Sequence, residues 1–128
     1  MAKEKLYIFD TTLRDGQQTQ GVDFSVQDKI IISEALDKFG LDYIEGGWPG
    51  ANPTDTKFFE SRPKLRNSKF TAFGMTKRTG RSADNDPQLR ALIDTNSDSI
   101  CLVAKTWDYH VDVALGVTLE ENLKSIED

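Results

Sequence analysis

Four short apolar runs recur along the chain and are separated by longer stretches that mix polar and apolar positions. The runs cover Lys5–Asp10, Leu41–Glu45, Lys69–Gly74 and Asp98–Ala104. Short apolar runs bounded by polar or glycine-rich segments are typical of buried β-strands. Because helical segments lie between them, the pattern predicts four βα units whose strands pair in parallel through right-handed crossovers.

The first helical segment follows Ser25, a residue type that favours the N-cap position. Gly40 favours helix termination at the other end. Apolar residues recur between these two positions at helical spacing. We therefore expect a buried face composed of Val26, Ile30, Ile31, Ala35, Leu36 and Phe39.

Further helices are predicted after the second, third and fourth strands. One covers Thr54–Ser61 and ends before Pro63, and another begins at Asp86–Pro87 and ends at Thr95. In the latter we expect three residues to face inward: Leu89, Leu92 and Ile93. A segment over Asp108–Leu115 follows the fourth strand. The last helix begins after Thr118, which has capping-box spacing to Glu121.

This α/β pattern fits an open doubly wound sheet or part of a (β/α)₈ barrel. Neither a GxGxxG motif nor a phosphate-binding GxxxxGK loop is present in the sequence, which disfavours nucleotide-binding folds. A whole barrel needs roughly 250 residues, and the chain has 128. We therefore expect residues 1–128 to form one partial barrel domain of about four βα units, with the C-terminal half of the barrel lying outside it.

Composition narrows the possible partners. The chain has 16 Lys and Arg against 21 Asp and Glu, a net charge of −5, which argues against a nucleic-acid partner. No apolar run approaches the roughly 20 residues of a membrane span, and the N-terminus lacks a signal-peptide pattern. The single cysteine, Cys101, lies within an apolar run and is expected to be a small buried residue. These features predict a cytoplasmic protein.

Charged residues gather where the predicted strands end. Arg14 and Asp15 follow the first strand, and Glu45 ends the second. In parallel α/β folds the carboxyl ends of the strands form the ligand site. An arginine there offers a planar fork to an oxyanion, and a glutamate on the next strand could orient that fork. A purely structural ion pair between Arg14 and Glu45 explains the residue types equally well.

The exact residue sequences of four segments favour one family. The segments TTLRDGQQ, YIEGGWPGANPTD, FTAFGMTKR and KTWDYHVDVAL resemble, in that order, the strand-end motifs of the DRE-TIM metallolyase family. This family includes 2-isopropylmalate, homocitrate and citramalate synthases and hydroxymethylglutaryl-CoA lyase. The resemblance extends from Tyr7 to Asp128 and is strongest to the citramalate synthase branch.

The resemblance implies the N-terminal half of a (β/α)₈ barrel and a metal-dependent acyltransferase. The implied reaction condenses acetyl-CoA with pyruvate to give (R)-citramalate, a step towards isoleucine and the other branched-chain amino acids. The alternative within the family is 2-isopropylmalate synthase, which uses 2-ketoisovalerate, and a lyase is disfavoured by the GWPGANPTD and WDYHV segments. An alternative from another class is a non-catalytic half-barrel that works by association, and we expect a homo-oligomer.

The resemblance also assigns roles to individual residues. Asp15 corresponds to a ligand of a divalent metal (Mg²⁺, Mn²⁺ or Zn²⁺), Arg14 to the group that stabilises the enolate or carbonyl oxygen, and Glu45 to the residue that orients Arg14. Gln18 corresponds to a glutamine near the substrate, and His110 is a further candidate for substrate contact. The family takes two more metal ligands from a His-x-His pair, but His110 is the single histidine of this sequence. We therefore expect this polypeptide alone to be inactive.

Overall fold

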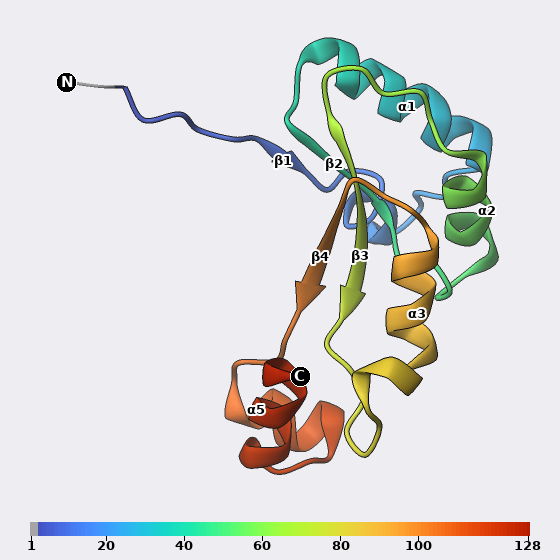
Figure 1. Cartoon of the computed structure of the whole chain (residues 1–128). Coiled ribbons are helices and arrows are strands. Elements are labelled where there is room, and N and C mark those ends of the chain that lie inside the picture. The colour runs from blue at the N-terminus through green and yellow to red at the C-terminus, as the bar shows by residue number, and fades with distance from the viewer. Residues whose placement is uncertain (1–2) are drawn as a thin grey trace.

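The computed structural model describes residues 3–128 and contains one four-stranded parallel sheet (Figure 1). Its strands lie side by side in sequence order, so each βα unit adds the next strand at the same edge. The strands are β1 (Phe9–Asp10), β2 (Tyr43–Gly47), β3 (Lys69–Met75) and β4 (Ser99–Val103). This arrangement confirms the prediction of four parallel βα units.

The helices follow the strands in the predicted order. They are α1 (Val26–Phe39), α2 (Pro53–Ser61), α3 (Pro87–Asp94), α4 (Asp108–His110) and α5 (Leu119–Glu127). Short 3₁₀ segments cover Gly16–Gln18 and Ala83–Asn85, and α4 continues directly into a π-helical segment, Val111–Leu115. Within residues 3–128, none of these helices is long and apolar enough to cross a membrane.

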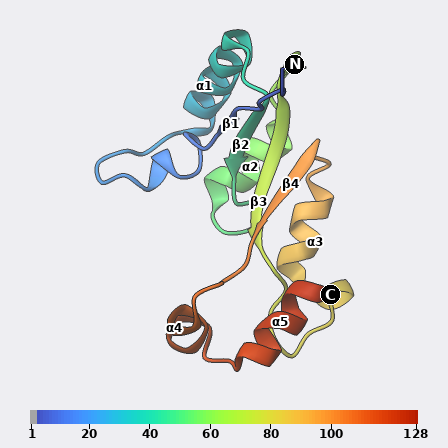
Figure 2. The same ribbon diagram turned by 90° about the vertical axis from the view of Figure 1, so that its left-hand side faces the viewer.

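Helices α1, α2 and α3 all lie on one face of the sheet, as Figures 1 and 2 show. Helices α4 and α5 lie beyond the ends of β3 and β4, where the strands point. The opposite face of the sheet carries no helix in the described part of the chain. The three packed helices thus leave one face of the sheet and the carboxyl ends of its strands available for a site.

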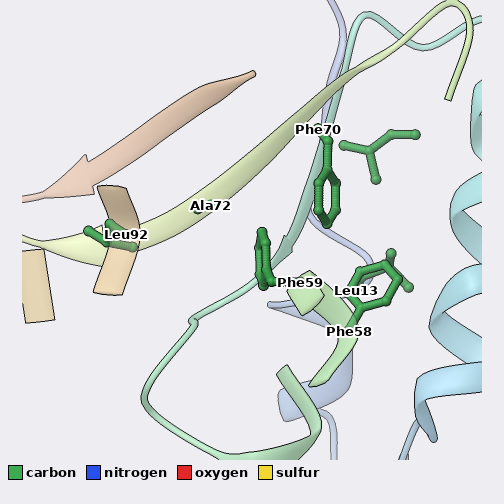
Figure 3. Close-up of a cluster of buried hydrophobic side chains, with 7 residues drawn as sticks. Leu13, Phe58, Phe59, Phe70, Ala72 and Leu92 are labelled. Carbon is green, nitrogen blue, oxygen red and sulfur yellow. The ribbon is translucent and has the colours of Figure 1, made fainter. Parts of the chain in front are cut away.

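The apolar core lies between the sheet and helices α1 to α3. Phe58 and Phe59 of α2 pack against Phe70 of β3, with ring centroids 5.3 and 4.7 Å apart, respectively. Figure 3 shows Leu13 beside Phe58, while Leu92 of α3 lies further along β3. The fully or nearly fully buried members of this cluster are Leu13, Ile44, Phe58, Phe59, Phe70, Ala72 and Leu92. Because side chains alternate along a strand, the residues between these core positions face the uncovered side.

The strand predicted over Lys5–Asp10 is longer than the observed β1. Only Phe9 and Asp10 pair with β2, although Ile8 also accepts hydrogen bonds from the backbone N–H groups of Asp42 and Tyr43. In residues 3–128, β1 is an edge strand next to β2 alone, and β2 begins at Tyr43, so the described residues before Ile8 have no strand to pair with. Their apolar side chains are exposed accordingly, among them Leu6 and Tyr7.

The predicted buried face of α1 was partly wrong. Ile31, Ala35 and Phe39 are exposed, and Phe39 retains 84% of its accessible surface. The fully buried positions of this helix are instead polar and four residues apart, namely Lys29, Ser33 and Asp37. Val26, Ile30, Ile32 and Leu36 flank them and pack at the margin of the core. The N-cap at Ser25 and the helix end at Gly40, which is left-handed, are as predicted, and Ser25 also forms a capping box with Asp28.

Two other burial predictions need correction. Ile93 of α3 is 60% exposed, whereas Leu92 is buried and Leu89 is partly buried as expected. Leu92 of α3 packs against Gly74 of β3, and Ile93, the next residue of the helix, points in a different direction. Cys101 is only partly buried, because β4 is the last strand of the sheet and no further strand covers that edge in residues 3–128.

Asp37 binds the loop before β3, at the amino-terminal ends of the strands. Its carboxylate accepts hydrogen bonds from the backbone N–H groups of Arg66, Asn67 and Ser68, at 2.7–3.0 Å, just before β3 begins. Burial alone would raise the pKa of this carboxyl, but the N–H donors outweigh it and lower the pKa. Asp37 is therefore a buried, charged anchor for the loop that leads into β3.

Candidate active site

A tight loop carries Arg14 out of β1. The backbone N–H groups of Arg14, Asp15 and Gly16 all donate to the carbonyl oxygen of Thr11, at 2.7–3.2 Å. Asp10, the last residue of β1, accepts hydrogen bonds from the N–H and the hydroxyl of Thr12. The loop is therefore locked by its own backbone, and Arg14 leaves it in a fixed direction.

Arg14 reaches Glu45 on the neighbouring strand. Its Nε–H donates to Glu45 Oε2 at 2.6 Å, a charge-assisted hydrogen bond. The Arg14 side chain is 19% exposed and that of Glu45 is 1% exposed. The guanidinium carbon also lies 4.1 Å from the ring centroid of Phe73 on β3, in cation–π geometry. The predicted contact between Arg14 and Glu45 is confirmed, and the pair lies on the helix-free face of the sheet.

A bulge in β2 follows Glu45. Glu45 is level with Thr71 of β3, but the next pairing joins Gly47 to Ala72, so Gly46 is an extra residue. A side chain at Gly46 would overlap the ring of Phe70, so the close approach of strand and core requires glycine there. Bulges redirect the strand at functional sites. Here the bulge turns the chain so that Trp48 packs edge-on against Phe73, with centroids 5.5 Å apart.

Asp15 and Gln18 lie at the solvent side of the same loop. The Asp15 carboxylate is 59% exposed and lies 3.4 Å from Arg14 Nη1. Gln18 ends the short 3₁₀ turn with its side chain exposed, and its backbone N–H donates to the carbonyl of Asp15 at 3.0 Å. Asp15 is free to bind a cation from solvent. It is one carboxylate, however, and residues 3–128 contain no cluster of three or more His, Cys, Asp or Glu side chains that could hold a metal. Asp15 can therefore supply one carboxylate of a divalent-metal site but does not complete such a site within residues 3–128.

His110 lies apart from the arginine pair. It ends α4, where its ring is 4.5 Å from that of Trp107 and 6.3 Å from that of Tyr109. All three side chains are exposed. Within residues 3–128 no hydrogen bond joins His110 to Arg14, Asp15, Gln18 or Glu45. The structure thus brings together Arg14, Asp15 and Glu45, and leaves His110 on a separate aromatic cluster at α4, which lies beyond the carboxyl end of β4 (Figure 2).

Cys101 is a neighbour of the pair that was not predicted. Burial raises the pKa of its thiol, and the adjacent Glu45 carboxylate raises it further, while Arg14 opposes the effect. Cys101 is paired with Phe73 across β3 and β4, so its side chain points to the same helix-free face as that of Phe73. The periodicity of the run SICLVA gave no indication of which face Cys101 would occupy, because the run is apolar throughout.

A buried ion pair between Lys29 and Asp55 was also missed. Lys29 is fully buried, and its ammonium bonds to the Asp55 carboxylate and to the carbonyl oxygens of Leu13 and Gly46, the latter two at 2.8 and 3.0 Å. A lysine in an amphipathic helix is normally read as a solvent-facing residue. Burying an ammonium costs several kcal/mol unless its hydrogen bonds are all satisfied, and all three N–H donors of Lys29 are.

The fold and the site together define a half-barrel whose strand ends carry an arginine–carboxylate pair. The HMGL-like family model matches residues 5–128, and the chain belongs to this family. Two solved structures of HMG-CoA lyases show the same fold. The one from Brucella melitensis has a TM-score of 0.71 at 15% identity, and the one from Bacillus subtilis has 0.72 at 19%. The chain covers 97% and 98% of its own length in these matches, but 43% and 41% of theirs. The prediction of half a (β/α)₈ barrel is thereby confirmed.

Relatives with higher identity are synthases. The chain is 53% identical over 125 residues to an (R)-citramalate synthase of Aquifex aeolicus and 48% identical over 128 residues to one of Streptomyces coelicolor. It is 37% identical over 125 residues to a 2-isopropylmalate synthase of Listeria innocua. At least 96% of the chain is covered in each match. The chain spans about a quarter of the length of these relatives, 24% in each case.

Because Cys101 is the single cysteine, its alkylation reports on the charge of Glu45. Replacing Glu45→Gln removes a negative charge that raises the thiol pKa, so the pKa falls and more reactive thiolate is present at a given pH. We expect the pH profile of iodoacetamide alkylation of Glu45→Gln to shift to lower pH. Arg14→Ala removes an opposing positive charge and should shift the profile to higher pH. Identical profiles for both variants and the wild type would contradict the placement of Cys101 beside the pair.

Proposed function

We propose that this chain is the arginine-bearing part of a Claisen-type acyltransferase that condenses acetyl-CoA with pyruvate to give (R)-citramalate. The observation that carries the proposal is the Arg14–Glu45 pair, held at 2.6 Å on the face of a half-barrel where a substrate can reach it. The identity of 53% and 48% to citramalate synthases, against 37% to a 2-isopropylmalate synthase, supports pyruvate as the keto acid. A cytoplasmic biosynthetic role, in the supply of branched-chain amino acids, goes with this proposal.

The role of Arg14 follows from its donors. In the condensation an enolate of acetyl-CoA attacks the keto carbon of pyruvate, and negative charge develops on oxygen atoms. The Nε–H of Arg14 donates a hydrogen bond to Glu45, and Nη1 donates one to Asp15. The remaining Nη N–H groups are therefore available for a substrate oxygen. A donor fixed before the reaction stabilises developing charge without reorganisation. Phe73 and Glu45 restrict the guanidinium from two sides, so its direction is preset.

The other candidate residues have lesser roles in this proposal. Asp15 would provide one carboxylate to a divalent metal whose chemistry is to polarise the carbonyl of the keto acid, with further ligands from outside residues 3–128. Gln18 lies on the same loop and is proposed to contact the substrate. His110 is proposed to contact the substrate or acetyl-CoA from α4. The base that deprotonates acetyl-CoA is not assigned to any residue of this chain.

A chimaera tests the proposal directly. This chain would replace the segment of the Aquifex aeolicus citramalate synthase to which it aligns, so that the rest of that enzyme completes the barrel. We expect the chimaera to release free CoA faster with pyruvate than with 2-ketoisovalerate. Arg14→Ala in the chimaera should lower kcat by about 10²–10³-fold, the usual cost of losing one oxyanion donor. The release of CoA is followed with a thiol reagent.

Arg90→Ala is the matched control for this measurement. Arg90 is also an arginine in an ion pair, with Asp94, but its side chain is 70% exposed on α3. Its replacement should leave kcat unchanged. The proposal fails if Arg14→Ala retains more than a tenth of the activity of the chimaera, and the choice of pyruvate fails if 2-ketoisovalerate is turned over faster.

A second candidate function, association without catalysis, is favoured by the exposed apolar surface at the last strand. β4 ends the sheet, so its outer edge has no strand neighbour in residues 3–128. Open parallel edges with exposed apolar side chains pair readily with other chains. The exposed apolar residues on β4 and α5 are Ile100, Leu102, Val103, Leu119, Leu123 and Ile126. We propose that a second copy of this half-barrel covers this surface when the 128-residue chain is isolated.

Light scattering coupled to gel filtration tests this candidate. The isolated chain is expected to have a mass of at least twice 14.4 kDa at high concentration, and Leu102→Lys, which places a charge on the edge strand, is expected to lower it. Ile31→Lys is the control, because Ile31 is equally apolar and exposed but lies on α1. A monomer at every concentration tested would rule out self-association.

A further inference from the structure

Lys29 joins three segments that are far apart in the sequence. It belongs to α1, and its ammonium donates to the carbonyl of Leu13, the carbonyl of Gly46 and the carboxylate of Asp55 on α2. The side chain is fully buried, and that of Asp55 is 6% exposed. The ammonium thus connects the loop after β1, the bulge of β2 and the start of α2 at one point.

Each backbone acceptor of Lys29 directly adjoins a residue of the arginine–carboxylate pair. Leu13 precedes Arg14, and Gly46 follows Glu45. Gly46 is the bulge residue left out of the pairing between β2 and β3, so the hydrogen bond from Lys29 compensates where the sheet ladder is interrupted. The two carbonyls are held to one nitrogen, which fixes the distance between the two chain segments that carry Arg14 and Glu45.

Asp55 extends this constraint past the end of β2. Its second carboxylate oxygen accepts the backbone N–H of Trp48 at 2.9 Å, and its own N–H is capped by Asn52 at 2.8 Å. A Cβ atom at Gly47 would lie 2.5 Å from this carboxylate, and Gly47 has a φ of 146°. Glycine at this position is what lets Asp55 approach the strand end. The bulge is therefore held on both sides, at Gly46 and at Trp48.

Stability alone does not explain this arrangement. A buried ion pair is commonly matched or exceeded in stability by well-packed apolar residues of the same volume. Burial lowers the pKa of the Lys29 ammonium, although Asp55 opposes the effect, so the charge is kept in place at a cost. What apolar replacements could not supply is the directed N–H bonds to Leu13 and Gly46.

We infer that Lys29 and Asp55 are positioning residues that set the relative placement of Arg14 and Glu45. They act through the backbone at Leu13, Gly46 and Trp48 and touch no substrate. This inference rests on the proposed function for its catalytic consequence, but its structural content concerns the pair alone. It can therefore be tested both with and without catalysis.

The test uses the variant Lys29→Met/Asp55→Asn. Methionine has nearly the length of lysine without its N–H donors, and asparagine keeps an oxygen for the Trp48 N–H. The alkylation profile of Cys101 in the 128-residue chain is measured with and without Glu45→Gln. In the wild-type background Glu45→Gln should shift the profile, whereas in the double variant, where Glu45 has lost its placement, the shift should shrink or vanish. An undiminished shift in the double variant overturns the inference.

The same variant in the chimaera gives the catalytic readout. Because small displacements of catalytic groups cost about 100-fold in rate, kcat should fall by about that factor while KM for pyruvate changes little. Asp55→Asn alone keeps the Lys29 bonds to both carbonyls, so its kcat should lie between those of the wild type and the double variant. This single variant replaces the double variant in the test if the double variant does not fold. Wild-type kcat in a folded double variant also overturns the inference.

Asp37→Asn is the matched control. Asp37 is as buried as Asp55, at 4% exposure, and also accepts backbone N–H groups, but it lies at the opposite ends of the strands. It should destabilise the chain without changing the alkylation shift or kcat, and an equal loss of kcat in Asp37→Asn would show that general destabilisation is the cause. If the wild-type chimaera is inactive, the proposed function fails, while the alkylation measurement still decides the inference.

Discussion

The structure depends on a single buried nitrogen. The Lys29 ammonium has three donors and three acceptors, which come from the loop after β1, the bulge of β2 and α2. An ammonium out of water with any donor unpaired would destabilise the fold, so these segments must all reach it. The core of phenylalanines brings the helix layer to the sheet, but apolar contacts have no direction. The directed contacts at Lys29 determine where each segment of the site begins.

One face of the sheet forms the apolar core, and the other carries the candidate site. Ile44, Phe70 and Ala72 point to the helices and form the core. Glu45 and Phe73, on alternate positions of the same strands, point to the helix-free face and hold Arg14. At the far end, Asp37 anchors the loop before β3. Buried polar residues of α1 thus form hydrogen bonds at both ends of the sheet, Lys29 beside the candidate site and Asp37 at the opposite end.

Local signals in the sequence were sufficient for most of the fold. The N-cap at Ser25, the capping box at Thr118, and the runs that became β3 and β4 predicted their elements to within a residue or two. The contact of Arg14 with Glu45 was also predicted, because Arg14 follows the first predicted strand and Glu45 ends the second. The burial of Lys29 could not be, since helical periodicity assigns a lysine to solvent and its acceptors are 16, 17 and 26 residues away. The length of β1 was predicted wrongly for a related reason. It depends on where β2, its neighbour in the described sheet, begins.

The half-barrel itself places Arg14 against Glu45, before any other part of a barrel or any ligand is present. The Nε–H resonance of Arg14 in a ¹⁵N–¹H spectrum of the isolated chain tests it most directly. We expect a resolved signal that exchanges slowly with water and moves or disappears in Glu45→Gln, in contrast to the rapidly exchanging Nε–H of the exposed Arg90. An Arg14 signal that exchanges as fast as that of Arg90 and is unaffected by Glu45→Gln would contradict it.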